Sequence, residues 1–353
     1  MPSIYKHGAF GEFAESIGGV VTQSATVPVY IGAAPVNLIR GYSSAGVVNG
    51  PVLLNDFSSA RSKMGYSGNW DSFTLCEAFK IRFDNMAGNA GPIVAINVLD
   101  PATHKKATET TQQITFTNGR ATITSDTIVL DTLVLADKVE GADYSVDYDW
   151  STGQVIIDSI GETPISGQIS ATFDEVDAAK VTATEIIGGV TAAGVYTGLG
   201  CVGLVYPELN LIPNLIAAPG WSDKPAVYAA MISAGTKING HWDAFVAADL
   251  PLEDSAAAVG TAEAGEARVG GAAIDTIEKA VQWAGDNGYN SERSKIFWPM
   301  AALSSGGNAH GSTLYAWRQM LVDETHDGVP METASNKAVP ISKQYFGASS
   351  TNR

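Results

Sequence analysis

The sequence predicts an α/β (α+β) multidomain protein, with layered α/β core domains and an inserted all-β domain that forms a small barrel or sandwich. In residues 211–251, two short apolar segments flank a helix with Pro225 in its first turn, the pattern of a parallel α/β unit covered on both faces. Residues 103–185 are instead rich in Thr, Ile and Val and in turn residues, as in short β-strands. A length of 353 residues with 45% hydrophobic residues allows two or three domains.

The chain begins with a glycine-rich segment, residues 1–22, whose aromatic residues follow no helical or strand period, and we expect it to be an N-terminal arm. Residues 23–102 are predicted to form an N-terminal α/β domain. Its strands lie in VPVYIG and GPIVAINVLD, and between them a glycine-rich crossing leads to a helix from about Asp71 to Met86. The predicted buried face of this helix consists of Phe73, Cys76, Phe79, Phe83 and Met86.

Residues 103–185 are predicted to form an acidic, β-rich inserted domain. Turn residues at 118–119 and 151–153 separate strand-length segments. In one segment apolar and polar residues alternate from Tyr144 to Trp150, so one face packs and the other meets water. The region carries 14 acidic and 5 basic residues, a net charge of −9 within a total of −16. We expect it on an outer surface, where these charges stay hydrated.

Residues 186–353 are predicted to form a second α/β core domain with a polar C-terminal tail. A helix around Glu266 to Gly285 has an apolar face that we expect to be buried, and an ion pair between Asp275 and Lys279. SKIFWPM is predicted to be a buried strand, and Ser312 to cap the next helix. The apolar residues expected to pack from these two helices are Ile274, Ile277, Val281 and Ala284, then Leu314, Trp317 and Leu321.

Composition indicates which partners, which cysteine state and which location the chain is expected to have. With 37 acidic against 21 basic residues, the chain is not expected to bind nucleic acid directly, because that affinity depends on clustered Lys and Arg. Cys76 and Cys201 lie far apart in apolar surroundings, which favours two buried, reduced thiols over a disulfide. Neither an export signal nor about 18 consecutive apolar residues occurs, so we expect no membrane insertion.

One motif matches the glycine fingerprint of dinucleotide-binding proteins, with Gly198, Gly200 and Gly203 at the required spacing. That loop must follow a strand and open a helix whose N-terminus receives the pyrophosphate. Here the preceding residues form a poor strand, and Pro207 follows closely. We therefore expect a structural glycine turn and no cofactor.

A second motif, Asp147, Asp149, Ser151 and Gly153, resembles the start of a calcium loop. Its glycine comes one position late and the twelfth position is Ser159 instead of an acidic ligand. A hairpin with acidic outer positions is the better interpretation. The five histidines, His7, His104, His241, His310 and His326, show no pairing at ligand spacing, so no metal site is predicted.

Catalytic residues are not predicted either. The sequence His310-Gly311-Ser312 is better interpreted as a loop leading into a helix cap than as a hydrolase site, and no nucleophile elbow occurs. Asp223 and Asp249 follow predicted strand ends, where α/β enzymes place their sites, and this alone keeps an enzyme in consideration.

Four stretches of the chain carry a family resemblance. Its core is Tyr206-Pro207, then LIPNLIAAPGWSD, the following helix and DAFVAADLP. The other three are the opening YKHGAFGEFAES, the block GPVLLNDFSSARSKMGY and the late DGVPMETASNKAVPI. Spread from residue 5 to about 341 and in the family's order, these stretches together resemble contractile tail sheath proteins of myovirus-type phages.

The resemblance implies a non-enzymatic structural subunit of a virion tail, assembled in the host cytoplasm. Such subunits polymerise helically around a tail tube and contract to drive the tube through a target cell envelope, without consuming nucleotide. The implied partners are neighbouring sheath subunits, the tail tube protein, and baseplate and tail terminator proteins. The family links its subunits through arms that add strands to a neighbour's sheet. In this chain the resemblance assigns that role to Ile4, Tyr5, His7, Phe10 and Phe13.

One departure concerns the C-terminus. In the family, the segment matching Ser335, Asn336 and Lys337 is followed by a further α/β stretch and a C-terminal arm, whereas this chain ends at Arg353. We therefore expect the C-terminal part of the family to be missing, and a chain without that arm to fold as a monomer without forming a contractile tube.

Three alternatives stay open at the level of sequence. The same subunit would serve a phage-tail-like bacteriocin. An NAD-binding α/β oxidoreductase would show saturable NAD binding that is lost in Gly200→Val. A surface-binding module would use the β insert to contact a glycan or another envelope component. Deletion of 103–185 would abolish adsorption under that interpretation and would spare assembly under the sheath interpretation.

Overall fold

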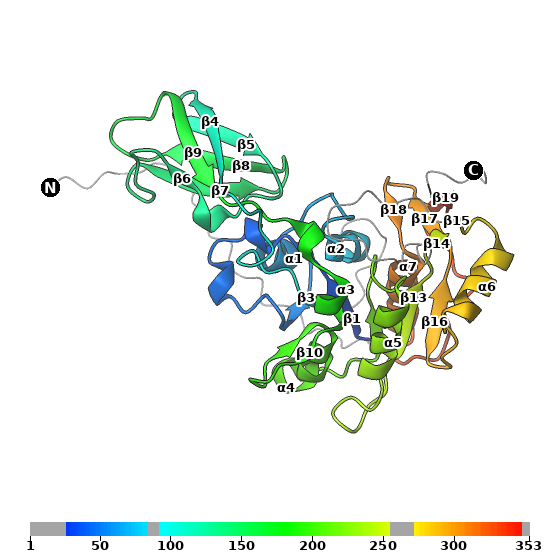
Figure 1. Cartoon of the computed structure of the whole chain (residues 1–353). Helices are drawn as coiled ribbons and strands as arrows, with labels where there is room; N and C mark the ends of the chain where they lie inside the picture. The colour runs from blue at the N-terminus through cyan, green and yellow to red at the C-terminus, as the bar shows by residue number, and fades with distance from the viewer. Residues whose placement is uncertain (1–25, 84–91, 255–271, 348–353) are drawn as a thin grey trace.

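The computed structural model describes residues 26–83, 92–254 and 272–347. Within these residues the centre of the molecule is a six-stranded sheet with the strand order β16-β13-β12-β1-β3-β2 (Figure 1). Five strands run parallel, and β2 pairs antiparallel with β3 at one edge. The strands are β1 (Pro28–Gly32), β2 (Pro51–Leu54), β3 (Ile93–Asn97), β12 (Leu215–Ala217), β13 (Phe245–Asp249) and β16 (Ser294–Phe297).

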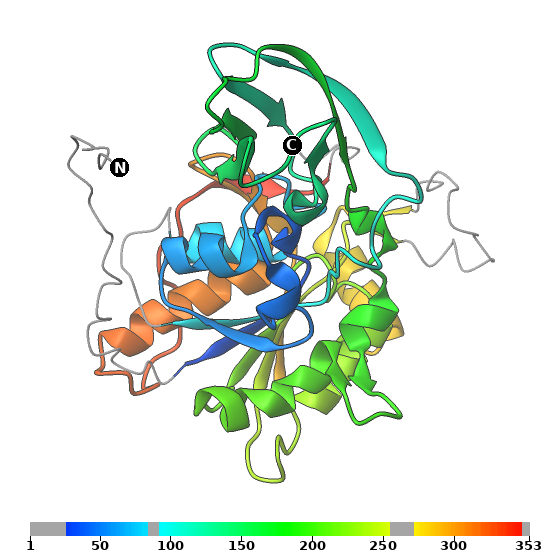
Figure 2. The ribbon, with the colours of Figure 1, turned by 90° about the vertical axis from the view of Figure 1, so that its left-hand side faces the viewer.

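Helices cover both faces of this sheet, as a mainly parallel sheet requires. Figure 2 shows the blue, cyan and orange helices on one face and the green helices on the other. The first group is α1 (Phe57–Met64), α2 (Leu75–Phe83) and α7 (Gly311–Glu324). The second is α3 (Ala183–Ile187), the 3₁₀-helix η5 (Gly198–Leu204), α4 (Val205–Leu209) and α5 (Pro225–Ala234).

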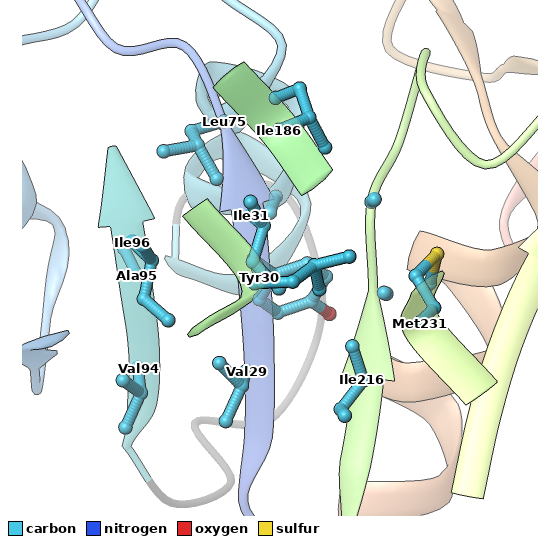
Figure 3. Packing of buried hydrophobic residues seen from close by; sticks show 14 of the residues in the cluster. Val29, Tyr30, Ile31, Leu75, Val94, Ala95, Ile96, Ile186, Ile216 and Met231 are labelled. Carbon is cyan, nitrogen blue, oxygen red and sulfur yellow. The ribbon is translucent and has the colours of Figure 1, made fainter. Parts of the chain in front are cut away.

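The core is built around β1, all five residues of which are buried. Val29 pairs in register with Val94 of β3 on one side and with Ile216 of β12 on the other. Figure 3 shows these side chains together with Ile186 of α3 and Met231 of α5. Residues on both sides of the insert, in 23–102 and in 186–353, therefore contribute strands to one sheet and share one hydrophobic core.

Within residues 103–185, all of which are described, residues 110–173 form a separate lobe with its own core (Figure 1). Val176 and Val181 instead pack into the core of the six-stranded sheet. Two antiparallel three-stranded sheets, β4-β9-β6 and β5-β8-β7, enclose that core. In β7 the residues alternate between buried and accessible as predicted, and Trp150 follows just after the strand. The strands are β4 (Thr110–Phe116), β5 (Arg120–Thr124), β6 (Val134–Leu135), β7 (Tyr144–Asp149), β8 (Gln154–Ser159) and β9 (Gly167–Phe173).

The turn η1 (Val36–Leu38) fastens the insert to the sheet. Leu38 belongs to the hydrophobic core of the insert and is 2% exposed. The buried amide of Asn37 donates hydrogen bonds to the carbonyls of Asp126 and Ile128, at 3.0 and 2.9 Å. Arg40 donates to the carbonyl of Leu130 at 2.8 Å and forms ion pairs with two carboxylates of the insert, Asp131 and Glu140.

The remaining elements are short or peripheral. α6 (Ile277–Asp286) precedes β16, and β17 (Met300–Leu303) pairs with both β18 (Asn308–Ala309) and β19 (Ile341–Tyr345). Two small antiparallel two-stranded sheets pair β10 (Gly189–Val190) with β11 (Tyr196–Thr197), and β14 (Glu253–Asp254) with β15 (Ala272–Ala273). The other 3₁₀ turns are η2 (Tyr42–Ser44), η3 (Leu130–Thr132) and η4 (Ala178–Lys180).

The predicted α/β unit in 211–251 and the ion pair between Asp275 and Lys279, at 2.7 Å, are confirmed. The helix predicted from Asp71 begins at Leu75, and Met86 lies outside the described residues. Helix α1 and strand β2 lie where the sequence analysis expected only a glycine-rich crossing and so were missed. Asp56 caps α1 by accepting from the Ser59 amide, a local signal that could have revealed the helix.

The predicted buried face of α6 is wrong in part, since Ala284 packs against the core as expected but two of its residues do not. Ile277 and Val281 are 70% and 66% exposed, and Ile274, although buried, precedes the helix. The helix packs instead through Ala280 and Trp283. The Trp283 ring lies 5.3 Å from the ring of Tyr289, which stacks on Tyr228 at 4.2 Å. A buried indole removes more apolar surface from water than an isoleucine or valine, so the aromatic face is turned inward.

The predicted buried strand in SKIFWPM is also wrong in part. Its residues fall into two strands, β16 and the start of β17, separated by Trp298-Pro299. All four residues of β16 are only partly buried, because within the described residues β16 is the edge of the six-stranded sheet.

We predict that Ile277→Lys and Val281→Lys change the free energy of unfolding by no more than about 0.5 kcal/mol, because both side chains already face water. Trp283→Ala removes a packed indole and is expected to cost about 3 kcal/mol. Urea unfolding followed by circular dichroism measures both. A large loss of stability in the lysine variants would contradict this placement of α6.

Candidate functional site

The carboxyl edge of the six-stranded sheet is the candidate site, because open α/β sheets bind ligands outside the carboxyl ends of their strands. Five side chains gather at this edge: Thr74 before α2, Glu77 on α2, Ser222 after β12, Asp249 at the end of β13 and His310 before α7. Of the two predicted aspartates, only Asp249 belongs to this cluster. Asp223 instead forms an ion pair with Lys224 at 3.0 Å, where both side chains are about one third exposed.

Asp249 is 3% exposed and is held by two serines. One oxygen accepts a hydrogen bond from the amide of Ser312 at 2.9 Å, and the other accepts from the hydroxyls of Ser312 and Ser222. The amide of Asp249 in turn donates to the Ser222 hydroxyl oxygen at 3.0 Å. Burial raises the pKa of Asp249, while the charge of His310 and the bonds from Ser312 act in the opposite direction.

The prediction that Ser312 caps α7 is therefore wrong. His310 occupies the N-cap position, and Ser312 lies in the first turn with its side chain fully buried against Asp249. The helix can start this close to the sheet because residue 311 is glycine. A Cβ there would lie 2.5 Å from the Cβ of Phe297.

His310 is paired with Glu77. Its Nδ1 lies 2.6 Å from one carboxylate oxygen of Glu77, and its amide donates to the other at 2.9 Å. Burial of the ring would lower the pKa of His310, but the charge and hydrogen bond of Glu77, helped by Asp249 and Asp223, raise it to about 9. The imidazole is therefore protonated at neutral pH and cannot act as a general base.

Within the described residues, no hydrogen bond joins His310 to Ser222 or Ser312, and both hydroxyls point at Asp249. This arrangement lacks the pairing of nucleophile and base that covalent catalysis needs. What it does is join α2, β13 and α7 through buried charge-assisted hydrogen bonds.

The crevice between the ends of β1 and β12 is filled by the chain itself. The hydroxyl oxygen of Thr74 accepts from the Ala33 amide and from the indole N–H of Trp221, both at 3.2 Å. A Cβ at Gly32 would lie 2.3 Å from that oxygen. Such close packing leaves no room for a ligand at this point of the edge.

The glycine fingerprint forms a structural turn, as predicted. It follows the two-residue strand β11, outside the six-stranded sheet, and it opens the 3₁₀-helix η5. Gly198 has a φ of +51°, and a Cβ at Gly200 would lie 2.5 Å from the carbonyl oxygen of Gly189. The Gly198 amide donates to Asn49 at 2.9 Å and is not free for a phosphate. Because Gly200→Val would clash in the folded chain, loss of NAD binding in that variant would not identify a nucleotide site.

A shallow cleft of about 350 Å³ lies beside this turn and is lined by Gly200, Gly203 and Lys237 among others. Its wall comes from the sides of η5 and α5 and from the turn after α5, and not from the carboxyl end of a parallel strand. It therefore differs from the crevice in which dinucleotide-binding proteins place the pyrophosphate.

The calcium-like sequence forms the turn of a hairpin. Asp149 accepts hydrogen bonds from the amide and hydroxyl of Ser151 and from the hydroxyl of Thr152. These bonds lower the pKa of Asp149 to about 2. Among the described residues, no three or more His, Cys, Asp or Glu side chains are placed to hold a metal ion.

Both cysteines lie in the described part of the chain, are buried and form no disulfide, which confirms the prediction of buried thiols. Burial raises the pKa of each thiol to about 12. The predicted arm residues Ile4, Tyr5, His7, Phe10 and Phe13 lie outside the described residues. No described helix has the length and apolar content that a membrane span requires.

An unpaired strand edge and exposed apolar side chains lie on the surface, away from the carboxyl edge. Four of the five residues of β19 are exposed, and within the described residues its outer edge pairs with no other strand. A strand edge of this kind presents backbone N–H and C=O groups to a partner. The exposed apolar side chains Ile277 and Val281 lie on α6.

No protein-family model matches the chain. The tail sheath protein of Burkholderia phage BcepMu is 30% identical to it over 219 residues, which cover 57% of this chain and 43% of that protein. The chain is similar in sequence to this phage tail sheath protein. The predicted resemblance is thereby confirmed, and the chain spans less than half the length of this relative. The name of the relative describes a tail component.

Two solved structures show a weaker likeness. One is a sheath tail protein from Desulfitobacterium hafniense, with a TM-score of 0.35 and 11% identity over 88% of this chain and 60% of that one. The other is a sheath tail protein from Listeria innocua, with a TM-score of 0.35 and 13% identity over 84% of this chain and 55% of that one. Scores this low add no argument about the fold.

The ion pair of His310 with Glu77 predicts how stability depends on pH. The pKa of His310 is raised from 6.5 to about 9 in the folded chain. The ion pair therefore contributes fully to the free energy of unfolding below pH 6.5, and this contribution is lost as the pH rises through about 9. The loss is on the order of 3 kcal/mol. Glu77→Gln is expected to flatten this dependence. Urea midpoints measured from neutral to alkaline pH test it, and an unchanged slope in Glu77→Gln would contradict the assignment.

Proposed function

We propose that the chain is a structural subunit of a contractile tail sheath. In this proposal it polymerises helically around a tail tube, and contraction of the sheath drives the tube through a target cell envelope. The observation that carries the proposal is the sequence relation to the BcepMu tail sheath protein. The closed carboxyl edge adds support, because a subunit that performs mechanical work needs no site for bond chemistry.

Neighbouring subunits are linked, in this proposal, by strand addition through the N-terminal arm, residues 1–22 with Ile4, Tyr5, His7, Phe10 and Phe13. Backbone hydrogen bonds give such a link adhesion without demanding particular side chains. We assign the outer edge of β19 as the acceptor, because its residues are exposed and its edge is unpaired within the described residues.

The energy for contraction then comes from a difference in subunit packing between an extended and a contracted lattice, summed over many identical interfaces. The acidic insert, residues 103–185, faces outward, where its net charge of −9 stays hydrated. It moves with the sheet as one body, because Asn37, Leu38 and Arg40 fasten it there. The other proposed partners are the tail tube, baseplate and tail terminator proteins, in a virion tail assembled in the host cytoplasm or in a phage-tail-like bacteriocin.

A proline substitution at Tyr5 tests whether the arm links subunits by strand addition. Tyr5→Pro removes a backbone N–H that strand addition needs, whereas Tyr5→Ala keeps it. In the chain extended by the C-terminal part of the sheath relative, we expect negative-stain microscopy to show long striated cylinders for the parent and for Tyr5→Ala, and none for Tyr5→Pro. The thermal unfolding of all three monomers should be the same.

Equal polymerisation of the proline and alanine variants would overturn strand addition by this part of the arm. Failure of the extended parent chain to form cylinders, alone and with tail tube protein, would overturn the sheath assignment itself.

A further inference from the structure

An open cleft of about 410 Å³ lies where the β insert meets the α/β core. One wall comes from residues 66–68, between α1 and α2, and the other from residues 124–126 and 148–153 of the insert. A volume of this size lies within the range of small-ligand pockets. The sheath proposal makes no use of this cleft.

The insert side of the cleft carries an aromatic pair. The rings of Tyr148 and Trp150 meet edge to face, with their centroids 4.8 Å apart. Tyr148 is 6% exposed, and Trp150 is partly buried just beyond the end of β7. Both side chains line the cleft, so it has an apolar wall of well-fixed geometry.

Three polar groups on the same wall keep hydrogen-bonding capacity. Asp126 uses one carboxylate oxygen to accept from the Ser67 hydroxyl at 2.6 Å, and its other oxygen has no partner within the described residues. The Tyr148 hydroxyl and the Trp150 indole N–H likewise have no partner there. Gly153 lies next to the Tyr148 hydroxyl, since a Cβ at that position would be 3.8 Å from it. The cleft thus combines one acceptor with two donors beside an aromatic surface.

The two walls are held in a fixed relation. The bond from Ser67 to Asp126 crosses the cleft, and the Asn37 amide holds the Asp126 carbonyl from the side of the sheet at 3.0 Å. A site whose walls are fixed before binding loses little entropy when a ligand enters.

The chemistry of these groups selects among ligand classes. The Asp126 carboxylate and the net charge of −9 on the insert disfavour phosphates and other anions. A cation such as choline would find the carboxylate and the rings but would leave the tyrosine and tryptophan donors unused. A neutral hydroxyl-rich ligand satisfies all three, because its hydroxyl groups both donate and accept while its C–H face packs on the rings.

From this geometry we propose that the cleft bounded by Ser67, Asp126, Tyr148 and Trp150 is a binding site for a neutral saccharide unit. Trp150 supplies the packing surface and Asp126 the acceptor for a sugar hydroxyl. This site is independent of the sheath assignment, because all of its lining residues come from one copy of the chain.

The test is saturation-transfer NMR and tryptophan fluorescence with the full chain. The probes are glucose, galactose, N-acetylglucosamine and their disaccharides, with inorganic phosphate and choline as the contrasting ligands. We expect saturable binding of at least one saccharide and none of phosphate or choline. Trp150→Ala should weaken that binding at least about tenfold, and Asp126→Asn should weaken it less, because asparagine still accepts from Ser67.

Two further variants keep the test decisive. Trp242→Ala changes a second surface aromatic pair, Tyr206 with Trp242 at 4.6 Å, and should leave binding unchanged. Gly68→Gln places a side chain in the cleft without a clash, since a Cβ there meets no atom within 4 Å, and should abolish binding even if Trp150→Ala folds poorly. The proposal is overturned if no saccharide binds, if choline or phosphate binds instead, or if Gly68→Gln binds as the parent does.

Discussion

The pairing of β1 with strands from both halves of the chain is the constraint on which this structure depends. β1 is buried on both faces, and its edges are taken by β3 and β12, which lie on opposite sides of the insert in sequence. A parallel sheet is stable only when both faces are covered, so α2 and α7 must pack on one side and α3 and α5 on the other. The chain therefore leaves the sheet after β3, builds the insert, and returns to complete the same sheet.

This arrangement of strands leaves the carboxyl edge of the sheet closed by the chain's own side chains. The ends of β1, β12 and β13 converge there, as in α/β enzymes, but Thr74, Trp221 and Asp249 close the edge from within. A buried ion pair between His310 and Glu77 fixes α7 to α2 at the same place. Breaking one partner of such a pair leaves a buried charge and is costly, so the edge acts as a rigid joint between layers. In our proposal the interacting surfaces are instead the exposed edge of β19, the arm and the outward face of the insert.

Sequence reasoning predicted the elements whose signals are local. The α/β unit of 211–251 and the alternation in β7 are cases in which apolar spacing and turn residues agree with the final packing. Where the outcome depends on a partner distant in sequence, the reasoning failed. In α6, spacing alone allowed a face with Ile277 and Val281, and only contact with Tyr289 selects the face with Trp283.

The cluster at the carboxyl edge shows the same limit. Ser312 has a favoured residue type for a helix cap, yet the buried carboxylate of Asp249, 63 residues away in sequence, draws it into the first turn. The joining of residues 23–102 and 186–353 in one sheet also rests on long-range pairing that no local pattern encodes. The proposed saccharide cleft combines Asp126, Tyr148 and Trp150 of the insert with residues 66–68 of the α/β core, and only the docking of the insert brings these two walls together.

The most direct test of the closed edge is amide hydrogen exchange of the native chain. The amides of Ala33 and Ser312 donate to side chains at this edge, to Thr74 and Asp249. If the edge is a permanent joint, both amides should exchange only through global unfolding, as slowly as the amides at the centre of β1. Fast exchange at Ala33 and Ser312, under conditions in which β1 stays protected, would mean that the edge opens in the native state and would contradict this account.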